Sequence, residues 1–382
     1  MVKTYCFLPV LLMFLQATGY SQVPDTSFLT LVFAGDIMGH DEQISGAWDE
    51  ESQAYNYEPT FRYVRPFIEQ ADIAIGNLEV TLAGPPYSGY PQFSSPDELA
   101  KASSAAGFDV MIQANNHALD RGKKGFERTL STLDTVSLIH TGAFRDADDR
   151  DRNYPLIVEK NNIRIALLNY TYGTNGIVIP PPFIINRIDT LQIRKDLQKA
   201  SLAMPDFVIV TVHWGDEYQR VENMQQRELA SFLFCQGTDA IIGSHPHVVQ
   251  PVRKHYSDPS DSSKYNMVVY SLGNFVSNQR AQYKDGGIVF FMKLSKTVSG
   301  TVLAEYSYLP CWVWRAERSG KYAFHILPVD LYNQNVSLFN MPDTDRSRIN
   351  RFYEDTKEHL KGIPENVFFN DFKFDRISAA GY

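Results

Sequence analysis

From Phe28 onward, apolar segments of strand length alternate with segments that have the hydrophobic spacing of helices. Strands that alternate with helices in this way form sheets that the helices cover, so the chain predicts an α/β fold with buried strands. The expected strands are Phe28–Ala34, Ile73–Gly76, Val110–Gln113, Ser137–His140, Ile163–Asn169, Phe207–His213, Ala240–Gly243 and Met267–Ser271. The expected helices are Phe61–Gln70, Asp97–Ala106, Gly125–Thr135, Asp189–Ala203 and Met224–Phe234.

The pattern changes after Gly286, where segments rich in β-branched and aromatic residues predict antiparallel strands. We expect these strands, between residues 286 and 330, to complete the same sandwich. They are Ile288–Leu294, Thr301–Leu309 and Lys321–Val329. One domain over residues 22–335 is therefore expected, followed by a C-terminal helical extension at 336–382 with its helix near Thr344–Leu360.

Residues 1–21 have the features of a secretory signal peptide. Lys3 precedes the short apolar segment Tyr5–Leu15, and small residues around Gly19 offer a cleavage site. The apolar segment is too short to span a bilayer as a stable helix, and no later segment is a candidate membrane helix. We expect an exported protein of the periplasm or cell envelope, and an uncleaved N-terminal anchor is the alternative.

The charge balance argues against nucleic acid as a partner. The chain has 36 Lys and Arg against 44 Asp and Glu, a formal net charge of −8, whereas proteins that bind phosphate backbones are usually basic. Cys235 and Cys311 remain after processing and can pair in an oxidising compartment, but the sequence does not place them together. Neither belongs to a Cys-x-x-Cys motif, which disfavours thiolate zinc sites and redox chemistry.

Two histidines directly follow a buried strand in the segment His245-Pro246-His247. Gly243 lets the backbone turn after the strand, and Pro246 fixes one φ angle between the two rings. Imidazole is the commonest metal ligand, and a His-x-His pair can serve one ion or two neighbouring ions. Two polar loop histidines without a metal are an equally good interpretation of this segment by itself.

Other candidate ligands also stand where an expected strand ends, and in α/β sheets ligands bind outside the carboxyl ends of the strands. Each has an ordinary explanation by itself, such as a turn or an exposed side chain, but together they predict a site. These oxygen and nitrogen donors suit manganese, zinc or iron better than calcium, and they suffice for one or two ions. The residues are Asp36, Asn77, Glu79, Asn115, Asn116, His117, His213, Asp216 and Glu217.

His117 lies beside the expected ligands rather than among them, so it is our candidate general acid for a leaving group. A dinuclear site can bind and deprotonate a water and stabilise charge on the attacking and leaving oxygens. Two long loops, Leu82–Pro96 and Tyr170–Phe183, carry tyrosines that either line a substrate groove or pack within ordered surface loops. No nucleophile elbow, phosphate loop or dinucleotide fingerprint is present in the sequence.

These motifs, taken in order, resemble the bacterial capsule-synthesis CapA family, which is associated with poly-γ-glutamate production and related to calcineurin-like metallophosphoesterases. The resemblance extends over most of the chain, from Leu29 to Val276. The segments that carry it are Gly35–Met38, Gly76–Glu79, Ala114–Gly122, His213–Tyr218, Gly243–His247 and Tyr270–Phe275.

The resemblance implies a four-layer α-β-β-α sandwich, metallophosphatase-like, with a dinuclear metal site. It implies His117 as the substrate-side histidine, while Asn169 and Thr171 match family positions to which we assign no chemistry. The metal ligands would be Asp36, Glu79, Asn116, His213, His245 and His247. The substrate-binding or supporting residues would be His40, Asn77, Asn115, Asp216, Glu217 and Asn274.

Two positions depart from the phosphoesterase pattern. That pattern opens with Asp-x-His, whereas Met38 is the second residue after Asp36 and the nearest histidine is His40. Its second motif uses an aspartate, whereas this chain offers Asn77 and Glu79. Glu79 can bridge two ions, and a single ion is the alternative.

The expected function is that of an exported metal-dependent hydrolase-like enzyme of capsule or poly-γ-glutamate biosynthesis. It would act through a metal-bound water on a cell-envelope polymer or a phosphoester, with an anionic polymer and capsule-synthesis membrane proteins as partners. The alternative is a non-catalytic protein of polymer binding, assembly or export that keeps the fold. Retention of His117 favours the enzyme, and the two departures favour the alternative.

Overall fold

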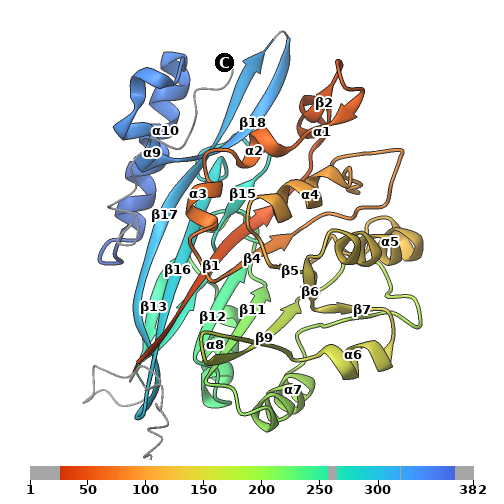
Figure 1. The fold of residues 1–382 in the computed structure, drawn as a ribbon, viewed down its shortest axis with the longest axis vertical. Coiled ribbons are helices and arrows are strands. Elements are labelled where there is room, and N and C mark those ends of the chain that lie inside the picture. The colour runs from red at the N-terminus through yellow and green to blue at the C-terminus, as the bar shows by residue number, and fades with distance from the viewer. Residues whose placement is uncertain (1–25, 257–264, 319, 366–382) are drawn as a thin grey trace, which may run out of the picture.

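The computed structural model describes residues 26–256, 265–318 and 320–365 (Figure 1). The expected signal peptide lies outside these ranges, as does the end of the expected C-terminal extension. No helix within the described ranges is both long and apolar enough to cross a membrane.

The larger sheet has eight strands in the order β18-β17-β16-β1-β4-β5-β6, with β15 paired to β1 beside this path. Strands β1, β4, β5 and β6 are parallel, and β16, β17 and β18 continue the sheet in antiparallel pairs. The C-terminal strands therefore complete the sandwich, as the sequence predicts. The strands are β1 (Ser27–Ile37), β4 (Ile73–Leu78), β5 (Val110–Ile112), β6 (Ile139–Thr141), β15 (Asn274–Val276), β16 (Gly286–Thr297), β17 (Gly300–Arg318) and β18 (Lys321–Pro328).

The second sheet has six strands in the order β13-β14-β12-β11-β9-β8. Its inner strands are parallel and its two edge strands, β13 and β8, are antiparallel to their neighbours. The strands are β8 (Leu156–Lys160), β9 (Ile163–Thr171), β11 (Phe207–His213), β12 (Ala240–Ser244), β13 (Val252–His255) and β14 (Asn266–Val269). Two short ribbons join β2 (Trp48–Asp49) to β3 (Ala54–Tyr55), and β7 (Ala143–Phe144) to β10 (Ile184–Ile185).

The two sheets pack face to face. Successive side chains along a strand point to opposite faces, so alternate residues enter the space between the sheets and the others face the helices. Phe33 of β1 and Leu167 of β9 belong to the buried cluster between the sheets. Their neighbours Ala34 and Leu168 belong to the two outer clusters, where helices cover each sheet. Each buried Leu or Phe side chain contributes about 1.5–3 kcal/mol to folding. The expected four-layer α-β-β-α sandwich is therefore confirmed.

Helices α2 (Glu58–Phe61), α3 (Arg65–Ile68) and α4 (Glu98–Ala105) cover the larger sheet, and α7 (Thr190–Leu202) and α8 (Met224–Cys235) cover the smaller one. The expected single helix Phe61–Gln70 is wrong. Pro59 and Pro66 lie in the first turns of α2 and α3, where a missing N–H is tolerated, so two short helices form instead. Helices α1 (Asp41–Ala47), α5 (Gly122–Thr135) and α6 (Ala147–Asn153) complete this part of the chain.

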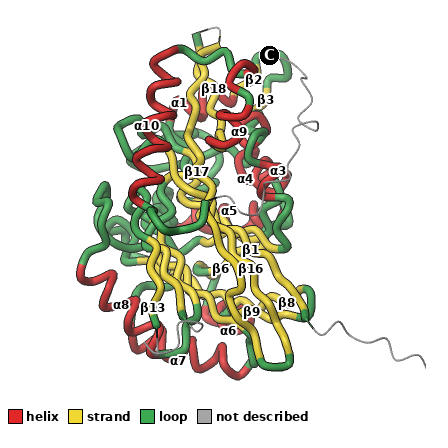
Figure 2. The backbone as a smooth tube through the Cα atoms, turned by 90° about the vertical axis from the view of Figure 1, so that its left-hand side faces the viewer, coloured by secondary structure: helices red, strands yellow, loops and turns green. Residues whose placement is uncertain are grey.

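The chain after β18 forms α9 (Val329–Gln334), a short 3-10 turn (Val336–Leu338) and α10 (Asp343–His359). Ile349 and Phe352 of α10 share a buried cluster with Trp312 of β17. Helices α9 and α10 therefore lie on the outer face of the hairpin formed by β16 and β17 (Figures 1 and 2). The helix expected near Thr344–Leu360 is confirmed. Cys235, exposed at the end of α8, and Cys311, buried in β17, are both free thiols.

Candidate metal centre

The carboxyl ends of strands from both sheets meet at one buried point. Asp36 near the end of β1 stands opposite Asn77 of β4 and Asn274 of β15, and His213 at the end of β11 stands opposite Ser244 of β12. All of the expected metal ligands are at most 4% exposed. They are Asp36, Glu79 and Asn116 from the larger sheet and His213, His245 and His247 from the smaller one.

The segment after β12 has the tight backbone that its sequence predicts. A Cβ atom on Gly243 would lie 1.9 Å from the carbonyl oxygen of Tyr270, so no larger residue fits there without a shift. His245 and His247 have φ angles of 100° and 58°, a conformation that non-glycine residues rarely adopt. The Tyr218 N–H donates to the Pro246 carbonyl at 2.7 Å and holds the turn. Backbone strain of this kind clusters at functional sites.

Both carboxylate oxygens of Asp36 have partners. The Asn77 amide donates to its Oδ1 at 2.8 Å, and His247 Nδ1 lies 3.0 Å from its Oδ2. Burial alone would raise the pKa of Asp36, but the hydrogen bond and charge of His247 outweigh it and lower this pKa to about 2. Burial lowers the pKa of His247, but the charge of Glu79 and the bond to Asp36 raise it to about 9.

The Glu79 carboxylate lacks hydrogen bonds. Its carboxylate is fully buried, and neither oxygen has a hydrogen-bond partner. One oxygen lies 3.4 Å from His213 Nε2 and 3.8 Å from His247 Nε2. Burial, followed by the charge of Asp36, raises the pKa of Glu79 well above its ordinary value. A buried carboxylate is costly without a compensating cation, so Glu79 marks the place where one fits.

The neighbouring histidines are held in the neutral form that binds metals. Burial lowers the pKa of His213 to about 3 and that of His245 to about 2. His213 Nε2 lies 2.8 Å from the Asn116 side-chain oxygen, and its Nδ1 lies 3.0 Å from the Ser244 hydroxyl. His245 Nδ1 is buried with no hydrogen-bond partner.

Two groups of ligand atoms lie close enough to hold a metal ion. Glu79, His245 and His247 form one group, and Asp36, Glu79 and His213 form the other, with the ligand atoms of each within 4.8 Å of one another. Glu79 belongs to both, which is the arrangement expected of a bridging carboxylate. Nitrogen and oxygen donors of this mix suit zinc, manganese or iron. The residues therefore fit one or two divalent ions.

His117 is buried beside these groups and is fixed by a carboxylate. Its Nδ1 lies 2.7 Å from Asp120 Oδ2, which also accepts the Phe93 N–H at 2.8 Å. The Phe93 ring packs edge-on against the imidazole at 4.7 Å. Burial lowers the pKa of His117, but the hydrogen bond that its ring donates to Asp120 and the charge of Glu79 outweigh it and raise this pKa.

The expected supporting residues differ in their positions. Asn115 is buried, donates to the Leu78 carbonyl at 2.9 Å and accepts the His117 N–H at 3.1 Å, so it shapes the loop that carries His117. Asn274 Oδ1 lies 3.1 Å from His247 Nδ1. Asp216 and Glu217 are exposed on the loop after His213.

His40 is half-buried and takes no part in either ligand group. The Asn278 N–H donates to its Nδ1 at 3.2 Å, and its ring packs against Phe93 at 5.3 Å. Met38, which replaces the histidine of the phosphoesterase pattern, is buried in the cluster beneath the helices of the larger sheet.

Sequence reasoning assigned no role to several residues that hold the site together. Asn169 Oδ1 accepts the Ala114 N–H at 2.7 Å, which ties the end of β9 to the loop after β5 and so joins the two sheets. The Tyr172 ring lies 4.6 Å from His245, which brings one of the two long loops to the site. The His117-x-x-Asp120 spacing was the available signal for the orienting carboxylate.

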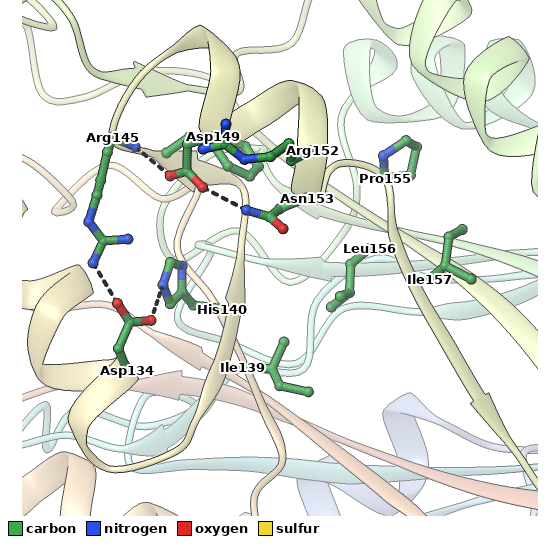
Figure 3. Close-up of a pocket in the computed structure, with 11 residues that line it drawn as sticks. Asp134, Ile139, His140, Arg145, Asp149, Arg152, Asn153, Pro155, Leu156 and Ile157 are labelled. Atoms are coloured by element: carbon green, nitrogen blue, oxygen red, sulfur yellow. Dashed lines mark hydrogen bonds and ion pairs between the residues drawn. The ribbon is translucent and has the colours of Figure 1, made fainter.

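A pocket of about 420 Å³ lies away from this centre, between the edges of the two sheets (Figure 3). Both of its carboxylates have close partners. Asp134 pairs with Arg145 at 2.6 Å and with His140 at 3.1 Å, and Asp149 accepts the Asn153 amide at 2.7 Å. The candidate functional site is therefore the centre around the unpartnered carboxylate of Glu79 rather than this pocket.

Two solved structures are similar over most of the chain. The NAD nucleotidase NadN of Haemophilus influenzae aligns with 88% of this chain and 68% of its own, with a TM-score of 0.46 and 13% identity. The calcineurin-like phosphoesterase YfkN of Bacillus subtilis aligns with 87% of this chain and 99% of its own, with a TM-score of 0.43 and 14% identity.

Two curated relatives are similar in sequence. The capsule biosynthesis protein CapA of Bacillus anthracis is 29% identical over 68% of this chain. The PGA biosynthesis protein CapA of Bacillus subtilis is 28% identical over 66% of this chain. The aligned part spans 63% and 64% of these relatives, respectively. The sequence pattern of a capsule-synthesis family matches residues 30–279, which include every candidate ligand. That match covers more than half of the chain and confirms the resemblance, so this protein belongs to the bacterial capsule synthesis protein PGA_cap family.

Proposed function

We propose that this protein is an exported metal-dependent hydrolase of capsule or poly-γ-glutamate metabolism. The observation that carries the proposal is the buried carboxylate of Glu79, which lacks a hydrogen-bond partner and belongs to both groups of candidate ligands. His117 lies beside these groups, held by Asp120. A structural ion needs ligands alone, whereas an oriented histidine next to the ligands suits catalysis.

Divalent ions would be held by Asp36, Glu79 and His213 and by Glu79, His245 and His247, with Asn116 beside His213. Ions bound there supply Lewis-acid polarisation of a substrate oxygen and a nucleophilic water at neutral pH. The low pKa of Asp36 and the neutral state of His213 keep these side chains in the form that binds a cation.

His117 would give a proton to the leaving group. Asp120 occupies its Nδ1 at 2.7 Å, which fixes the ring and leaves Nε2 as the nitrogen that exchanges a proton with substrate. The carboxylate of Asp120 is itself fixed by the Phe93 N–H. A histidine oriented by a carboxylate in this way serves a leaving oxygen or a leaving nitrogen, so the arrangement suits a phosphoester or an amide.

The proposed substrate is an anionic polymer of the cell envelope. The relative in Bacillus subtilis is named for PGA biosynthesis and that in Bacillus anthracis for capsule biosynthesis. The chain carries a net charge of −8, which would repel an anionic polymer. Cations bound at the metal centre would therefore bind the carboxylates of the polymer. Membrane proteins of capsule synthesis are the proposed protein partners, in the periplasm or cell envelope.

One observation favours a non-catalytic role in polymer binding, assembly or export. Met38 is buried at the position where the phosphoesterase pattern has a histidine, so one ligand of that pattern is absent. With fewer ligands, the centre would hold a single ion that supports the fold. Metal content and turnover separate the two roles.

The first experiment measures metal content per chain for protein purified without a metal-affinity tag. The wild type should contain one or two manganese, zinc or iron ions, and the His245→Ala/His247→Ala variant should lose them. An ion-free wild type, even after incubation with Mn²⁺ or Zn²⁺, would overturn the proposal of a metal-dependent enzyme.

The second experiment measures hydrolysis of a p-nitrophenyl phosphodiester and of a γ-glutamyl amide. His117→Ala should keep its metal and lose about 10²–10⁴-fold in kcat, because proton transfer contributes that much. Asp120→Asn should reduce kcat less, since the ring keeps a hydrogen-bonding neighbour. Unchanged turnover in His117→Ala would refute its role, and normal metal content with no turnover of any substrate by the wild type would favour the assembly protein.

A further inference from the structure

A second pocket, of about 300 Å³, lies where the β17–β18 hairpin meets the beginning of α10. It is lined by three arginines from separate parts of the chain. Arg280 comes from the loop between β15 and β16, Arg315 from β17 and Arg348 from α10. We call this the arginine pocket. Glu317 and Asp345 also line it, which leaves one excess positive charge.

The guanidinium groups of the arginine pocket are poorly neutralised. Among the described residues, no carboxylate lies within ion-pair distance of Arg280 or Arg315, and Arg348 reaches Asp345 only at 3.8 Å. In the pocket of Figure 3, by contrast, Arg145 pairs with Asp134 at 2.6 Å. Arg145 is thus neutralised by a close carboxylate, whereas Arg280 and Arg315 are not.

The unpaired arginines are nevertheless held in place. Arg280 donates to the Val313 carbonyl at 2.6 Å and lies 5.3 Å from the centre of the Trp312 ring. Arg315 lies 4.1 Å from the centre of the Tyr322 ring. Side chains that are already ordered lose little conformational entropy when a ligand binds.

Two donors of the pocket have no acceptor, although Glu317 and Asp345 also line it. The Nε atom of Arg280 and the indole nitrogen of Trp314 are both buried with no hydrogen-bond acceptor. Burial lowers the pKa of Arg280, and the positive charges of Arg315 and Arg348 lower it further, while Asp285 and Asp345 oppose them. A negatively charged group in the pocket would relieve this repulsion.

We propose that the arginine pocket is a binding site for an oxyanion, carried by free phosphate or by the carboxylates of an anionic polymer. Guanidinium groups present paired N–H donors that match the oxygens of carboxylate and phosphate groups. The proposal goes beyond the metal centre and does not depend on the proposed hydrolysis, because its residues include none of the candidate ligands.

Isothermal titration of wild type with inorganic phosphate and, separately, with a γ-glutamyl oligomer tests this site. Arg315→Gln and Arg348→Gln should each weaken binding by roughly tenfold or more, the loss expected for one charged hydrogen bond. Arg346→Gln is the matched control, because this residue lies on the same helix, contacts Asp343 at 3.8 Å and does not line the pocket. It should bind like the wild type.

The His245→Ala/His247→Ala variant separates this site from the metal centre and should keep the binding that Arg348→Gln loses. Binding of phosphate alone would identify a free anion as the ligand, and binding of the oligomer would identify a polymer carboxylate. No binding of either probe, or equal loss in Arg346→Gln and Arg348→Gln, would overturn the proposal. A His245→Ala/His247→Ala variant that loses its metal but still binds the oxyanion would support a separate site in the arginine pocket.

Discussion

The aspartates at the amino ends of the parallel strands contrast with Glu79 at the carboxyl ends. At the amino ends, an aspartate precedes each of several strands and exchanges two hydrogen bonds with one residue of the neighbouring strand. Asp109, for example, accepts the Ala74 N–H at 2.8 Å and donates its own N–H to the Ala74 carbonyl at 2.9 Å. The same pattern joins Asp72 to Thr30, Asp206 to Arg164 and Asp239 to Val208.

At the carboxyl ends, the carboxylate of Glu79 has no such partner. An aspartate that closes a backbone ladder stabilises the fold by satisfying a buried N–H. A buried carboxylate without a partner destabilises the metal-free fold and persists only where a ligand compensates it. The lack of hydrogen-bond partners, rather than burial, therefore distinguishes Glu79 from the structural aspartates.

The largest effect should come from metal removal. If the ion binds only the folded chain at 100–1,000 times its Kd, chelation should lower the free energy of unfolding by about 3–4 kcal/mol. Thermal unfolding with EDTA, and again after restoring Mn²⁺ or Zn²⁺, measures this change. Metal should still stabilise the Asp109→Ala variant by this amount, whereas it should not stabilise His245→Ala/His247→Ala. Identical melting curves with and without chelator would contradict the claim that a bound metal ion compensates the buried carboxylate of Glu79.

A smaller loss of stability should follow from removing one aspartate acceptor at the amino end of a strand. Asp109→Ala leaves the Ala74 N–H without its acceptor and should lower the free energy of unfolding by about 1–3 kcal/mol. Asp109→Asn keeps a side-chain oxygen and should lose less. Urea unfolding measures both variants, and metal content should equal that of the wild type. A fall in metal content would show that the two ends are not independent.

Glu79→Gln should change stability in opposite directions with and without metal. In metal-free protein the variant removes a carboxyl group whose ionised form is disfavoured by burial and by the charge of Asp36, so its free energy of unfolding should rise by about 1 kcal/mol. With metal present it should unfold more easily than the wild type, because it has lost a ligand. Urea unfolding under both conditions measures the change, and destabilisation without metal would show that Glu79 is a structural residue.

The smallest effect concerns the pH dependence of Asp239. Burial raises its pKa to about 6, against the opposing hydrogen bond from Val208. Because the folded state holds this proton more tightly than the unfolded state, the carboxyl group destabilises the fold as pH rises from about 4 to about 6. Asp239→Asn should therefore match the wild type near pH 4 and be more stable above pH 6, by about 1 kcal/mol after solvent screening.

Urea unfolding across this pH range checks the prediction. Asp206→Asn is the control, because its carboxylate also pairs with Lys296 at 2.7 Å and its replacement removes that attraction. A constant difference between wild type and Asp239→Asn at every pH would refute the assigned pKa.

Local patterns were enough to predict much of the fold and the composition of the candidate site. Buried strands appear as apolar segments, and a polar residue directly after such a segment is brought to the sheet edge, as with Asp36 and His213. Helix breaks were harder to place, because Pro66 is compatible with either a kink or a new helix. Strand β17 continues through Pro310, which is tolerated because β18 pairs with β17 only from Cys311 onward.

Contacts between distant segments escaped sequence reasoning. Asn169 holds the loop after β5 although these residues are 55 positions apart. The arginine pocket combines residues from a loop, a strand and a helix, and no spacing in the sequence relates them. Resemblance to a family indicates which residues matter near its motifs, but it does not indicate partners outside them.

The position of β1 determines when the candidate metal centre can be completed during folding. β1 lies inside the larger sheet between β4 and β16, and Ser27 stands opposite Lys296. Its edge therefore stays unpaired until most of the chain has been synthesised, and pairing of such distant segments is slow. Asn274, the neighbour of Asp36 in β15, also lies far along the chain from β1. Metal loading should thus follow the assembly of both sheets rather than nucleate it.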